Sequence, residues 1–420
     1  MIQKPRGTMD ILPKDVATWQ FIESKARSVA AKFGFSEIRF PSFESTELFH
    51  RGVGDSTDVV QKEMYTFTDR EGRSLTLRPE GTASVARTLI ENGMCSDTMP
   101  LKLYYLINCF RYEKPQAGRS REFFQFGVEL FGAADAAADA EIIAVAHSLI
   151  KELGIKNTKL HINSIGCPEC RPAYRQALKD YFAENSAELC DTCKGRLETN
   201  PLRILDCKSP ICSEIAKNAP KTVDHLCPEC KQHMDELEAY LQEMGIEYEI
   251  DPHIVRGLDY YTRTVYEFIA TDIGAQSTIL GGGRYDGLIK DLGGPALSGI
   301  GFAAGITRLI LAMEKSGVNI ESENRPALYI ASMGKGAAKY AMGVVAKLRN
   351  EGIYAETDLV GRSLKAQMKY ADKKRAKFTL IIGDSELENN KAQLKNMDNS
   401  QQTEIALDDI NALKSMLSAE

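Results

Sequence analysis

The sequence predicts an α+β fold in which a cysteine-rich segment interrupts a large N-terminal domain and a small α/β domain ends the chain. Three observations lead to this expectation. Two apolar stretches, 102–110 and 123–131, flank a polar loop, which is typical of a long β-hairpin. Eight of the ten cysteines fall between Cys167 and Cys230. From 327 onwards buried strands alternate with helices, which indicates a small α/β domain.

The first elements follow from the spacing of apolar residues. Residues 15–33 carry apolar side chains on one helical stripe and Gly34 stands at the C-cap position, so a helix is predicted there. The next segment, 35–43, alternates towards a strand that ends near Pro41. Up to the cysteine-rich segment we further expect a strand at 74–77, a helix at 82–90, the hairpin, a helix at 136–153 and a strand at 159–165.

The elements after the cysteine-rich segment form two groups. The first group consists of strands at 247–250, 264–269 and 300–304, the last followed by a helix that contains Arg308. A polar stretch from 314 to 326 marks a linker. The second group, which makes up the α/β domain, has strands at 327–331 and 378–382 and a helix at 336–350.

The composition limits the possible functions. A chain of 420 residues is long enough for two or three domains, and 43% hydrophobic with 26% charged residues is typical of globular proteins. No apolar run approaches the roughly 18 residues of a membrane-spanning helix, and the N-terminus lacks the apolar core of a signal peptide. We therefore expect a cytoplasmic protein with no membrane partner. The net charge of −6 excludes a wholly basic nucleic-acid binder, so any nucleic-acid contact must use local basic patches.

The clustered cysteines form three C-x-x-C pairs and one wider pair. Without a secretion signal this pattern favours structural zinc over disulfides, because four thiolates complete the zinc tetrahedron and leave no open position for catalysis. The alternative is a set of reduced or redox-labile thiols. The segment has few large apolar residues, so we expect it to need a metal for folding. We favour Cys167, Cys170, Cys190 and Cys193 as one set and Cys207, Cys212, Cys227 and Cys230 as the other, while other pairings stay open.

The second strand of the predicted hairpin has two different faces, because strand side chains repeat every two residues. One face, from Phe124 to Leu130, is uniformly apolar and suits a core. The other face places a ring, an amide, a gap and a carboxylate in a row: Phe123, Gln125, Gly127 and Glu129. Such a row suits a pocket floor, where a buried Glu129 needs a partner. The alternative is a solvated face, as many antiparallel sheets have.

Two further strings set arginines, tyrosines and an acid beside glycines: IVRGLDYYT (254–262) and LGGGRYDGL (280–288). Glycines let the backbone approach a ligand closely, and the set suits an imidazole-bearing molecule held next to a phosphate. Both strings resemble the signature motifs of histidyl-tRNA synthetases. Residues 33–41, 110–121 and 299–308 resemble, in that order, motifs 1, 2 and 3 of class II aminoacyl-tRNA synthetases. The resemblance covers nearly the whole chain.

The resemblance implies a division into domains. Residues 1–322 would form a class II catalytic domain on a mixed, mostly antiparallel sheet, interrupted by the cysteine-rich insertion at 166–241. A linker at 323–326 would lead to an anticodon-binding domain at 327–420. Motif 1 and the helix before it would form an isologous homodimer interface.

The resemblance also implies roles for single residues. The histidine site would consist of Glu80, Thr82 and Gln125 at the amino group, of Glu129, Tyr261 and Tyr285 at the imidazole nitrogens, and of Tyr260 beside them. The ATP site would consist of Arg111, Arg119, Phe123 and Arg308. The catalytic residues would be Arg256 and Arg111. The acceptor end of the tRNA would meet Gln116, Arg119 and Arg121.

The implied reaction joins histidine to its tRNA at the expense of ATP, which would carry Mg²⁺. The histidine carboxylate would attack phosphorus in line, a step that needs positioning and positive charge rather than a nucleophilic side chain. Residues 361–377 carry seven Lys or Arg against one Asp and suit either a solvated helix face or a contact with tRNA.

Three other functions are disfavoured. Regulatory subunits of ATP phosphoribosyltransferase share the catalytic core of the family, but they lack the C-terminal domain and typically lose the arginine motifs that are intact here. Class II synthetases for proline, threonine or glycine do not carry the string RGLDYY (256–261). The glycine run at 281–283 lacks the order of a P-loop.

Overall fold

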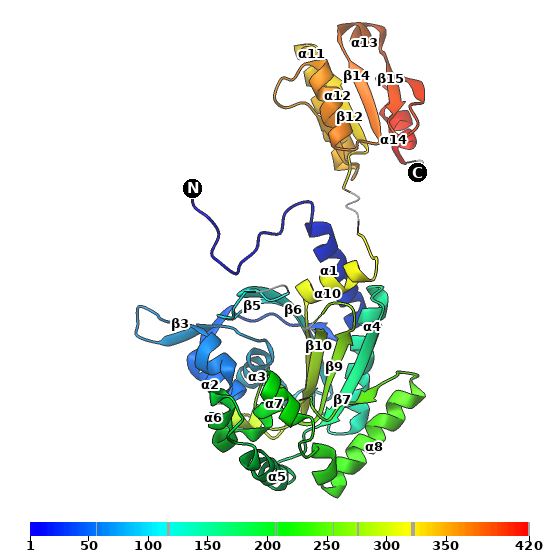
Figure 1. Cartoon of the computed structure of the whole chain (residues 1–420). Helices are drawn as coiled ribbons and strands as arrows, with labels where there is room; N and C mark the ends of the chain where they lie inside the picture. The colour runs from blue at the N-terminus through cyan, green and yellow to red at the C-terminus, as the bar shows by residue number, and fades with distance from the viewer. Residues whose placement is uncertain are drawn as a thin grey trace. The chain divides into compact units, whose positions relative to one another are not determined.

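The computed structural model describes residues 1–418 apart from 56, 116–117, 206, 208, 255, 275–276 and 321–323. Contacts divide the chain into two compact units, 1–320 and 321–420, which Figure 1 draws from blue to red along the chain. No helix among the described residues is long and apolar enough to cross a membrane.

An eight-stranded sheet forms the centre of the first unit (Figure 1). In spatial order its strands are β1 (Ser36–Glu37), β5 (Leu101–Phe110), β6 (Glu122–Phe131), β11 (Gly299–Gly305), β10 (Thr278–Arg284), β9 (Thr262–Ala270), β7 (Thr158–Ser164) and β8 (Glu249–Ile250). Only the pairs at the two edges, β1 with β5 and β7 with β8, are parallel. The expected mixed, mostly antiparallel sheet is therefore confirmed.

Helices cover both faces of this sheet. One face carries the largest apolar core, which packs under α1 (Val16–Lys32), α4 (Ala136–Glu152) and α10 (Ile306–Lys315). The other face carries α3 (Thr82–Glu91), the short turns η2 (Met94–Ser96) and α9 (Leu288–Asp291), and a second core that contains Tyr105. A small three-stranded sheet lies beside them, with β2 (Phe43–Ser45), β4 (Ser74–Leu77) and β3 (Tyr65–Thr68) in that order and with α2 (Thr46–Val53) and η1 (Val59–Glu63) next to it.

The segment 166–241, which we call the cysteine module, folds into helices between β7 and β8. Its elements are α5 (Arg171–Glu184), α6 (Asp191–Thr199), η3 (Pro201–Ile204), α7 (Pro210–Ala216), η4 (Thr222–His225) and α8 (Pro228–Glu243), which runs on beyond the module. The module encloses its own apolar cluster, in which Tyr174, Leu178 and Phe182 of α5 are buried. The expectation that the module is poor in core because it has few large apolar residues was wrong, since α5 gathers such residues on one helical face.

A five-stranded mixed sheet forms the second unit. Its order is β13 (Ala355–Thr357), β12 (Leu328–Ser332), β14 (Phe378–Ile382), β15 (Lys391–Asn396) and β16 (Gln402–Ala406), with the first three strands parallel and the last two antiparallel. The helices are α11 (Lys335–Asn350), α12 (Leu364–Lys373), α13 (Asp384–Asn389) and α14 (Ile410–Ser418). The α/β class predicted for this part of the chain is confirmed.

One strand prediction was wrong, and one strand of the large sheet was missed. The strand expected over 35–43 is reduced to β1, which covers two residues at the sheet edge; Pro41 offers no N–H to continue a ladder. Strand β10 was not predicted, because its run of glycines has no alternation and a low strand propensity. The predicted hairpin is confirmed, with β5 and β6 paired from Leu101–Phe131 to Phe110–Glu122.

Candidate active site

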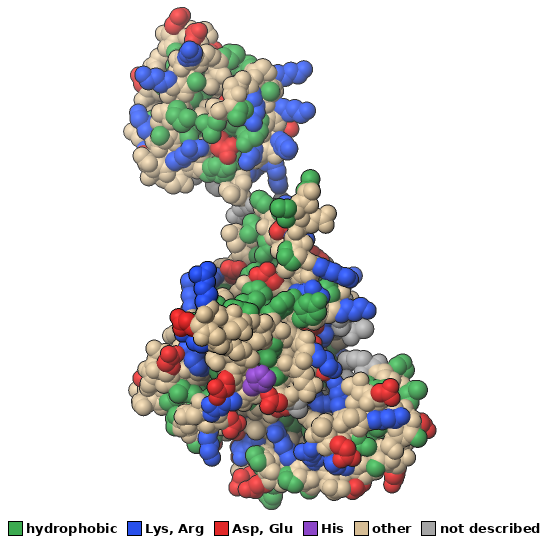
Figure 2. Space-filling view, turned by 90° about the vertical axis from the view of Figure 1, so that its left-hand side faces the viewer, with side chains coloured by type: hydrophobic (Ala, Val, Ile, Leu, Met, Phe, Trp, Pro, Cys, Tyr) green, Lys and Arg blue, Asp and Glu red, His purple; other side chains and the backbone are tan. Residues whose placement is uncertain are grey.

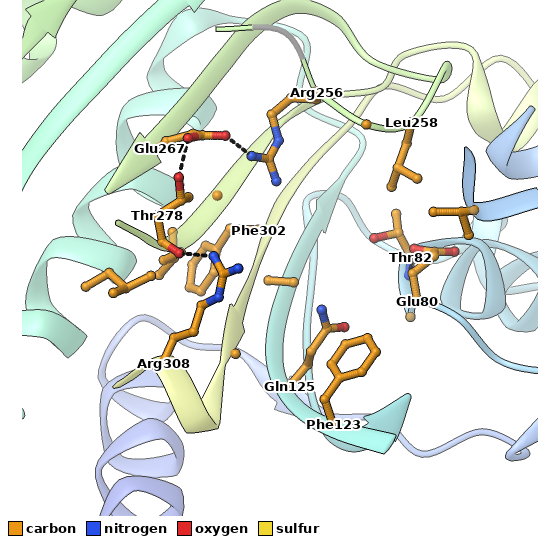
Figure 3. A pocket seen from close by; sticks show the side chains of 18 of the residues that line it. Glu80, Thr82, Phe123, Gln125, Arg256, Leu258, Glu267, Thr278, Phe302 and Arg308 are labelled. Atoms are coloured by element: carbon orange, nitrogen blue, oxygen red, sulfur yellow. Dashed lines mark hydrogen bonds and ion pairs between the residues drawn. The ribbon is translucent and has the colours of Figure 1, made fainter. Parts of the chain in front are cut away.

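A cavity of about 500 Å³ lies in the first unit on the sheet face that carries α3. Its floor is formed by β6, β9, β10 and β11, and its walls by the hairpin loop, the start of α3 and the loop before β9. Figure 3 shows the side chains that point into it, with Glu80 and Thr82 on one wall and Arg256 and Arg308 on the opposite one. The strand face that carries Phe123 and Gln125 therefore forms part of a pocket, and the alternative of a solvated face is excluded.

The deep end of the cavity is built around Glu129, whose side chain is completely buried. Its carboxylate accepts hydrogen bonds from Thr82 Oγ1 at 2.7 Å, from Tyr105 Oη at 3.0 Å and from the hydroxyl of Tyr285. Burial raises the pKa of Glu129 to about 8, and the hydroxyls of Tyr285 and Thr82 act against that rise. The three hydroxyls are the partners that a buried carboxylate needs.

Glu80 lies on the cavity wall at the N-terminus of α3. Its two carboxylate oxygens accept the backbone N–H groups of Thr82 at 2.7 Å and Ala83 at 2.8 Å. Burial raises the pKa of Glu80, while these two N–H groups lower it. The arrangement fixes the carboxylate at the rim of the cavity and satisfies two of the free N–H groups at the helix start.

Three tyrosines, Tyr260, Tyr261 and Tyr285, form a wall at the deep end of the cavity. The ring of Tyr260 lies 4.7 Å from that of Tyr261 and 5.5 Å from that of Tyr285, measured between centroids. All three side chains are buried and line the cavity. Because each ring carries a hydroxyl at its edge, the stack offers polar atoms in an otherwise apolar wall.

Arg256 is held against the floor by a carboxylate. Its guanidinium pairs with Glu267 of β9, which also accepts Thr278 Oγ1 at 2.6 Å (Figure 3). Burial acts to lower the pKa of Arg256, and the charge of Glu267 more than offsets it, so the pKa lies above the ordinary value. A Cβ on Gly281 would stand 2.6 Å from the guanidinium, so only glycine leaves room for the arginine at that position.

Three further arginines gather at the outer end of the cavity. Arg111 donates its Nε–H to the carbonyl of Pro79 at 2.8 Å and lies over the ring of Phe123, 5.4 Å from its centroid. Arg119 pairs with Glu113 at 3.0 Å. Arg308 donates to the carbonyl of Thr278, and burial followed by the charge of Arg119 lowers its pKa. Guanidinium groups at this density suit a polyanion such as a row of phosphates.

Most of the residues predicted for the site meet at this cavity. Those that line it are Glu80, Thr82, Arg111, Arg119, Phe123, Gln125, Arg256, Tyr260, Tyr261, Tyr285 and Arg308. Glu129 lies just behind its wall, bonded to Thr82 and Tyr285. Arg121 lies outside it, with its guanidinium 3.8 Å from the ring centroid of Tyr112. Gln116 lies outside the described residues.

Sequence reasoning missed Tyr105, Glu113 and Glu267. Glu267 is a carboxylate within the otherwise apolar stretch Val265–Ala270, which is a signal that could have been used. Tyr105 carries no such signal, because its role depends on the pairing that sets it opposite Gly127. A Cβ on Gly127 would stand 2.1 Å from the ring of Tyr105.

The clustered cysteines form two groups of four thiols, each with all sulfur atoms within 4.8 Å of one another. The neck cluster consists of Cys167, Cys170, Cys227 and Cys230, and the inner cluster of Cys190, Cys193, Cys207 and Cys212. The favoured grouping was wrong: α8 packs against α4, and its N-cap residue Cys227 lies 3.9 Å from Cys167, which follows β7, measured between the sulfur atoms. The open alternative of pairing across the groups is the one observed.

Both clusters fit a zinc ion. In the neck cluster Cys167 Sγ lies 3.6 Å from Cys170 Sγ and 3.9 Å from Cys227 Sγ. Four sulfurs at about 2.3 Å from zinc stand about 3.8 Å apart in a tetrahedron. Backbone N–H groups also point at the sulfurs, from Cys227 to Cys170 at 3.1 Å and from Cys190 to Cys212 at 3.2 Å. Such N–H groups stabilise thiolates, which are the form that binds the metal.

Comparison with known proteins identifies the family. The profile of histidyl-tRNA synthetases matches residues 7–309, and that of the anticodon binding domain matches residues 327–414. A histidine–tRNA ligase of Acetivibrio thermocellus is 54% identical over 408 residues, which cover 97% of this chain and 98% of the relative. One of Caldanaerobacter subterraneus subsp. tengcongensis is 52% identical over 410 residues, which cover 98% of both chains.

A solved structure agrees with this result. The apo histidyl-tRNA synthetase of S. aureus is 41% identical and superposes with a TM-score of 0.83, over 100% of this chain and 99% of the other. Sequence, cavity and comparisons therefore agree, and the chain belongs to the histidyl-tRNA synthetase family of class II aminoacyl-tRNA synthetases.

Proposed function

We propose that this chain activates histidine with ATP to give histidyl-adenylate and pyrophosphate, and then transfers histidine to the 3′ end of its tRNA. The observation that carries the proposal is one cavity with a hydroxyl-lined carboxylate at its deep end, three guanidinium groups at its outer end and that of Arg256 between them. The deep end suits an imidazole, and the outer end suits a triphosphate. The two substrates would thus meet between Gln125 and Arg256.

The deep end would select histidine. Glu129 and the hydroxyls of Tyr261 and Tyr285 would face the two imidazole nitrogens, while Glu80, Thr82 and Gln125 would take the amino group. Tyr260 would pack beside the ring. An amino acid without an imidazole would leave these buried polar groups without partners, and that loss is a strong basis for rejection.

The outer end would hold ATP. Phe123 and Arg308 would enclose the adenine, and Arg111 and Arg119 would bind the phosphates through their guanidinium groups. Mg²⁺ would accompany ATP, because this ion is usually held by phosphates together with one or two carboxylates. Glu113 and Glu267 line the cavity and offer carboxylate oxygens near the arginines.

The first step would be an attack by the histidine carboxylate on the α-phosphorus, with pyrophosphate leaving in line. Arg256, between the two ends, and Arg111 would stabilise the charge that develops on the transferring group. Arg256 is already oriented by Glu267, and its Nε has no hydrogen-bond partner among the described residues. In the second step the tRNA 3′ hydroxyl would attack the activated carbonyl carbon, and AMP would leave.

Contacts with tRNA would come from both units. Gln116, Arg119 and Arg121 belong to the hairpin loop and would meet the acceptor end. The second unit, 327–420, would bind the anticodon, with 323–326 as the linker from a catalytic domain at 1–322 that is interrupted at 166–241. Figure 2 shows many Lys and Arg side chains on the visible face of the second unit. Lys365, Lys369 and Lys373 of α12 are exposed, which supports a contact of this helix with a phosphate backbone.

The chain would act as a homodimer through motif 1 and its preceding helix. Phe43 and Phe67 are about half exposed, at 50% and 43%, and their rings lie 6.4 Å apart on the small sheet that follows motif 1. An exposed aromatic pair of this kind is typical of a protein interface. A monomer with full activity at micromolar concentration, measured by light scattering, would contradict the dimer.

Pyrophosphate exchange tests the activity itself. The purified chain should exchange labelled pyrophosphate into ATP in the presence of histidine and should do so far more slowly with alanine, proline, threonine or glycine. Exchange with one of these amino acids and none with histidine would refute the proposal.

A further inference from the structure

Two arginines of the cysteine module donate hydrogen bonds to backbone carbonyls in the rest of the first unit. Arg171 donates to the carbonyl of Tyr261. Arg203 donates to the carbonyls of Arg256 and Gly257, both at 3.2 Å. These three carbonyls lie at the two ends of the segment 256–261, which we call the histidine loop.

The histidine loop has two sides with different tasks. Its side chains Arg256, Tyr260 and Tyr261 line the candidate active site. The loop forms neither helix nor strand, so its carbonyls have no regular backbone ladder to supply partners. A second cavity of about 310 Å³ separates the loop from the module, and Arg171 and Arg203 line it. The arginines thus bridge a gap that packing alone does not fill.

Arg203 is itself fixed by a third arginine. Arg196 of α6 pairs with Asp58 at 2.9 Å and donates to the carbonyl of Arg203 at 3.2 Å. Asp58 immediately precedes η1, outside the module. The chain of contacts therefore runs from η1 through α6 and η3 to the histidine loop.

Each clamping arginine stands beside one thiol cluster. Arg171 directly follows Cys170 of the neck cluster. Arg203 lies in η3, between Cys193 and Cys207 of the inner cluster. A long side chain holds a carbonyl in place only when its own backbone is fixed, because it otherwise samples many rotamers. A metal ion held by four thiolates would fix the backbone directly before Arg171 and on both sides of Arg203.

We propose that the cysteine module positions the histidine loop. Arg171 and Arg203 hydrogen-bond to the loop's carbonyl groups, and a zinc ion in each thiol cluster fixes the backbone that carries these arginines. Both are positioning residues, since they bond to backbone behind the site. The inference rests on the proposed function, because its main readout is the binding of histidine.

The first experiment compares arginine variants in pyrophosphate exchange by the full chain. In Arg171→Ala and Arg203→Ala the KM for histidine should rise about tenfold, as expected for the loss of a charge-assisted hydrogen bond, with the KM for ATP within about twofold of wild type. Arg175→Ala is the matched control. Arg175 lies one turn along α5, and its partners among the described residues are the module's own carbonyls at Glu198 and Thr199, so its loss should leave both constants unchanged.

Two outcomes of this experiment overturn the proposal. One is a histidine KM in both variants equal to wild type, with the metal content intact. The other is an equal rise for histidine and ATP, or the same rise in Arg175→Ala, since either result indicates general damage to the fold. Should an alanine variant fail to fold, Arg171→Lys and Arg203→Lys carry the test. Lysine keeps the charge but lacks the planar fork, so a smaller rise in the histidine KM is expected and a wild-type value overturns the idea.

The second experiment tests the metal. Chain purified under reducing conditions should contain two zinc ions, one for each cluster. Cys227→Ser and Cys207→Ser should each lose one ion and should weaken histidine binding in calorimetry about tenfold, while ATP binding changes within about twofold. Metal-free wild-type chain with full histidine affinity, or variants that lose zinc and keep that affinity, overturn the proposal. Failure of the proposed function is distinguishable, because wild type would then show no histidine-dependent exchange at all.

Discussion

The two ends of the candidate active site use different chemistry. At the deep end one completely buried carboxylate, Glu129, is surrounded by hydroxyl groups of Thr82, Tyr105 and Tyr285. At the outer end guanidinium groups predominate, each resting on a carboxylate or a backbone carbonyl. Neutral hydroxyls around a buried acid suit selection by hydrogen bonding, whereas fixed cations suit the stabilisation of charge. Selection and rate should therefore respond separately to substitution.

The largest effect is expected at the boundary between the ends. Arg256→Ala should lower the single-turnover rate of adenylate formation about 10²–10³-fold, because loss of one preorganised donor to a developing charge typically has that effect. Histidine affinity should change much less. Arg73→Ala is a suitable control. Arg73 is exposed, does not line the cavity, and forms an ion pair with Asp69 at 2.7 Å. Unchanged single-turnover kinetics in Arg256→Ala would remove its catalytic role.

Glu129→Gln should separate selection from rate. The amide keeps the shape but changes the hydrogen-bonding pattern at the deep end, so the KM for histidine should rise about 10–100-fold, as expected for one or two buried hydrogen bonds. The KM for ATP should stay near wild type. A variant in which both constants rise together would show that the two ends are not independent.

Substitutions of two glycines, one at each end of the cavity, compare how tightly the two ends are packed. In Gly127→Ala the new Cβ would meet the Tyr105 ring at 2.1 Å, whereas in Gly305→Ala its nearest neighbour is Arg308 Cγ at 4.0 Å. Overpacking should lower the free energy of unfolding of Gly127→Ala by about 1–3 kcal/mol and weaken histidine binding. Gly305→Ala should stay within about 0.5 kcal/mol of wild type. Equal stability of the two variants by urea denaturation would be the contrary result.

A further difference between the ends is a pH dependence that belongs to the deep end. The pKa of Glu129 in the folded chain, about 8, lies above its value in the unfolded chain, near 4.3. The folded chain therefore retains a proton that the unfolded chain releases. This stability is fully present below about pH 4 and is lost progressively as the pH rises towards about 8. In urea denaturation between about pH 5 and 8, the free energy of unfolding of wild type should fall with pH and that of Glu129→Gln should lack this fall. The same pH dependence in both chains would show that the pKa of Glu129 is not raised.

The local pattern of apolar and polar residues was sufficient to predict much of the fold and the strand face that forms part of the cavity floor. Alternation along the second hairpin strand put Gln125 and Glu129 on one side, and the pairing of Glu129 with Leu103 and of Gly127 with Tyr105 lies within the predicted hairpin. The family was recognised from short strings of arginine, tyrosine and glycine. The roles of single residues towards histidine, ATP and tRNA stay predictions.

Long-range contacts account for what the sequence did not reveal. Glu267 matters because β9 pairs with β10 and brings its carboxylate to Thr278 and Arg256. The grouping of the cysteines depends on the packing of α8, which brings Cys227 to Cys167, and no spacing rule encodes that contact. The buried ion pair of Arg284 with Asp139, which is also bonded to His233 and Thr264, joins four elements that are distant in the chain. Such contacts follow from the assembled sheet rather than from any one segment.

The neck cluster makes the cysteine module a closed appendage. Cys167 and Cys227 are 60 positions apart in the chain and 3.9 Å apart in space, so everything between them forms a loop tied at its base. Changes of length inside that loop leave the positions of β7 and β8 as they are. On the proposal above, the whole appendage should be exchangeable as one block when the newcomer brings two donors for the carbonyls behind the histidine loop. A chimera made by joining foreign sequence at the neck has a defined requirement for success, which is the placement of two side chains rather than the matching of an entire surface.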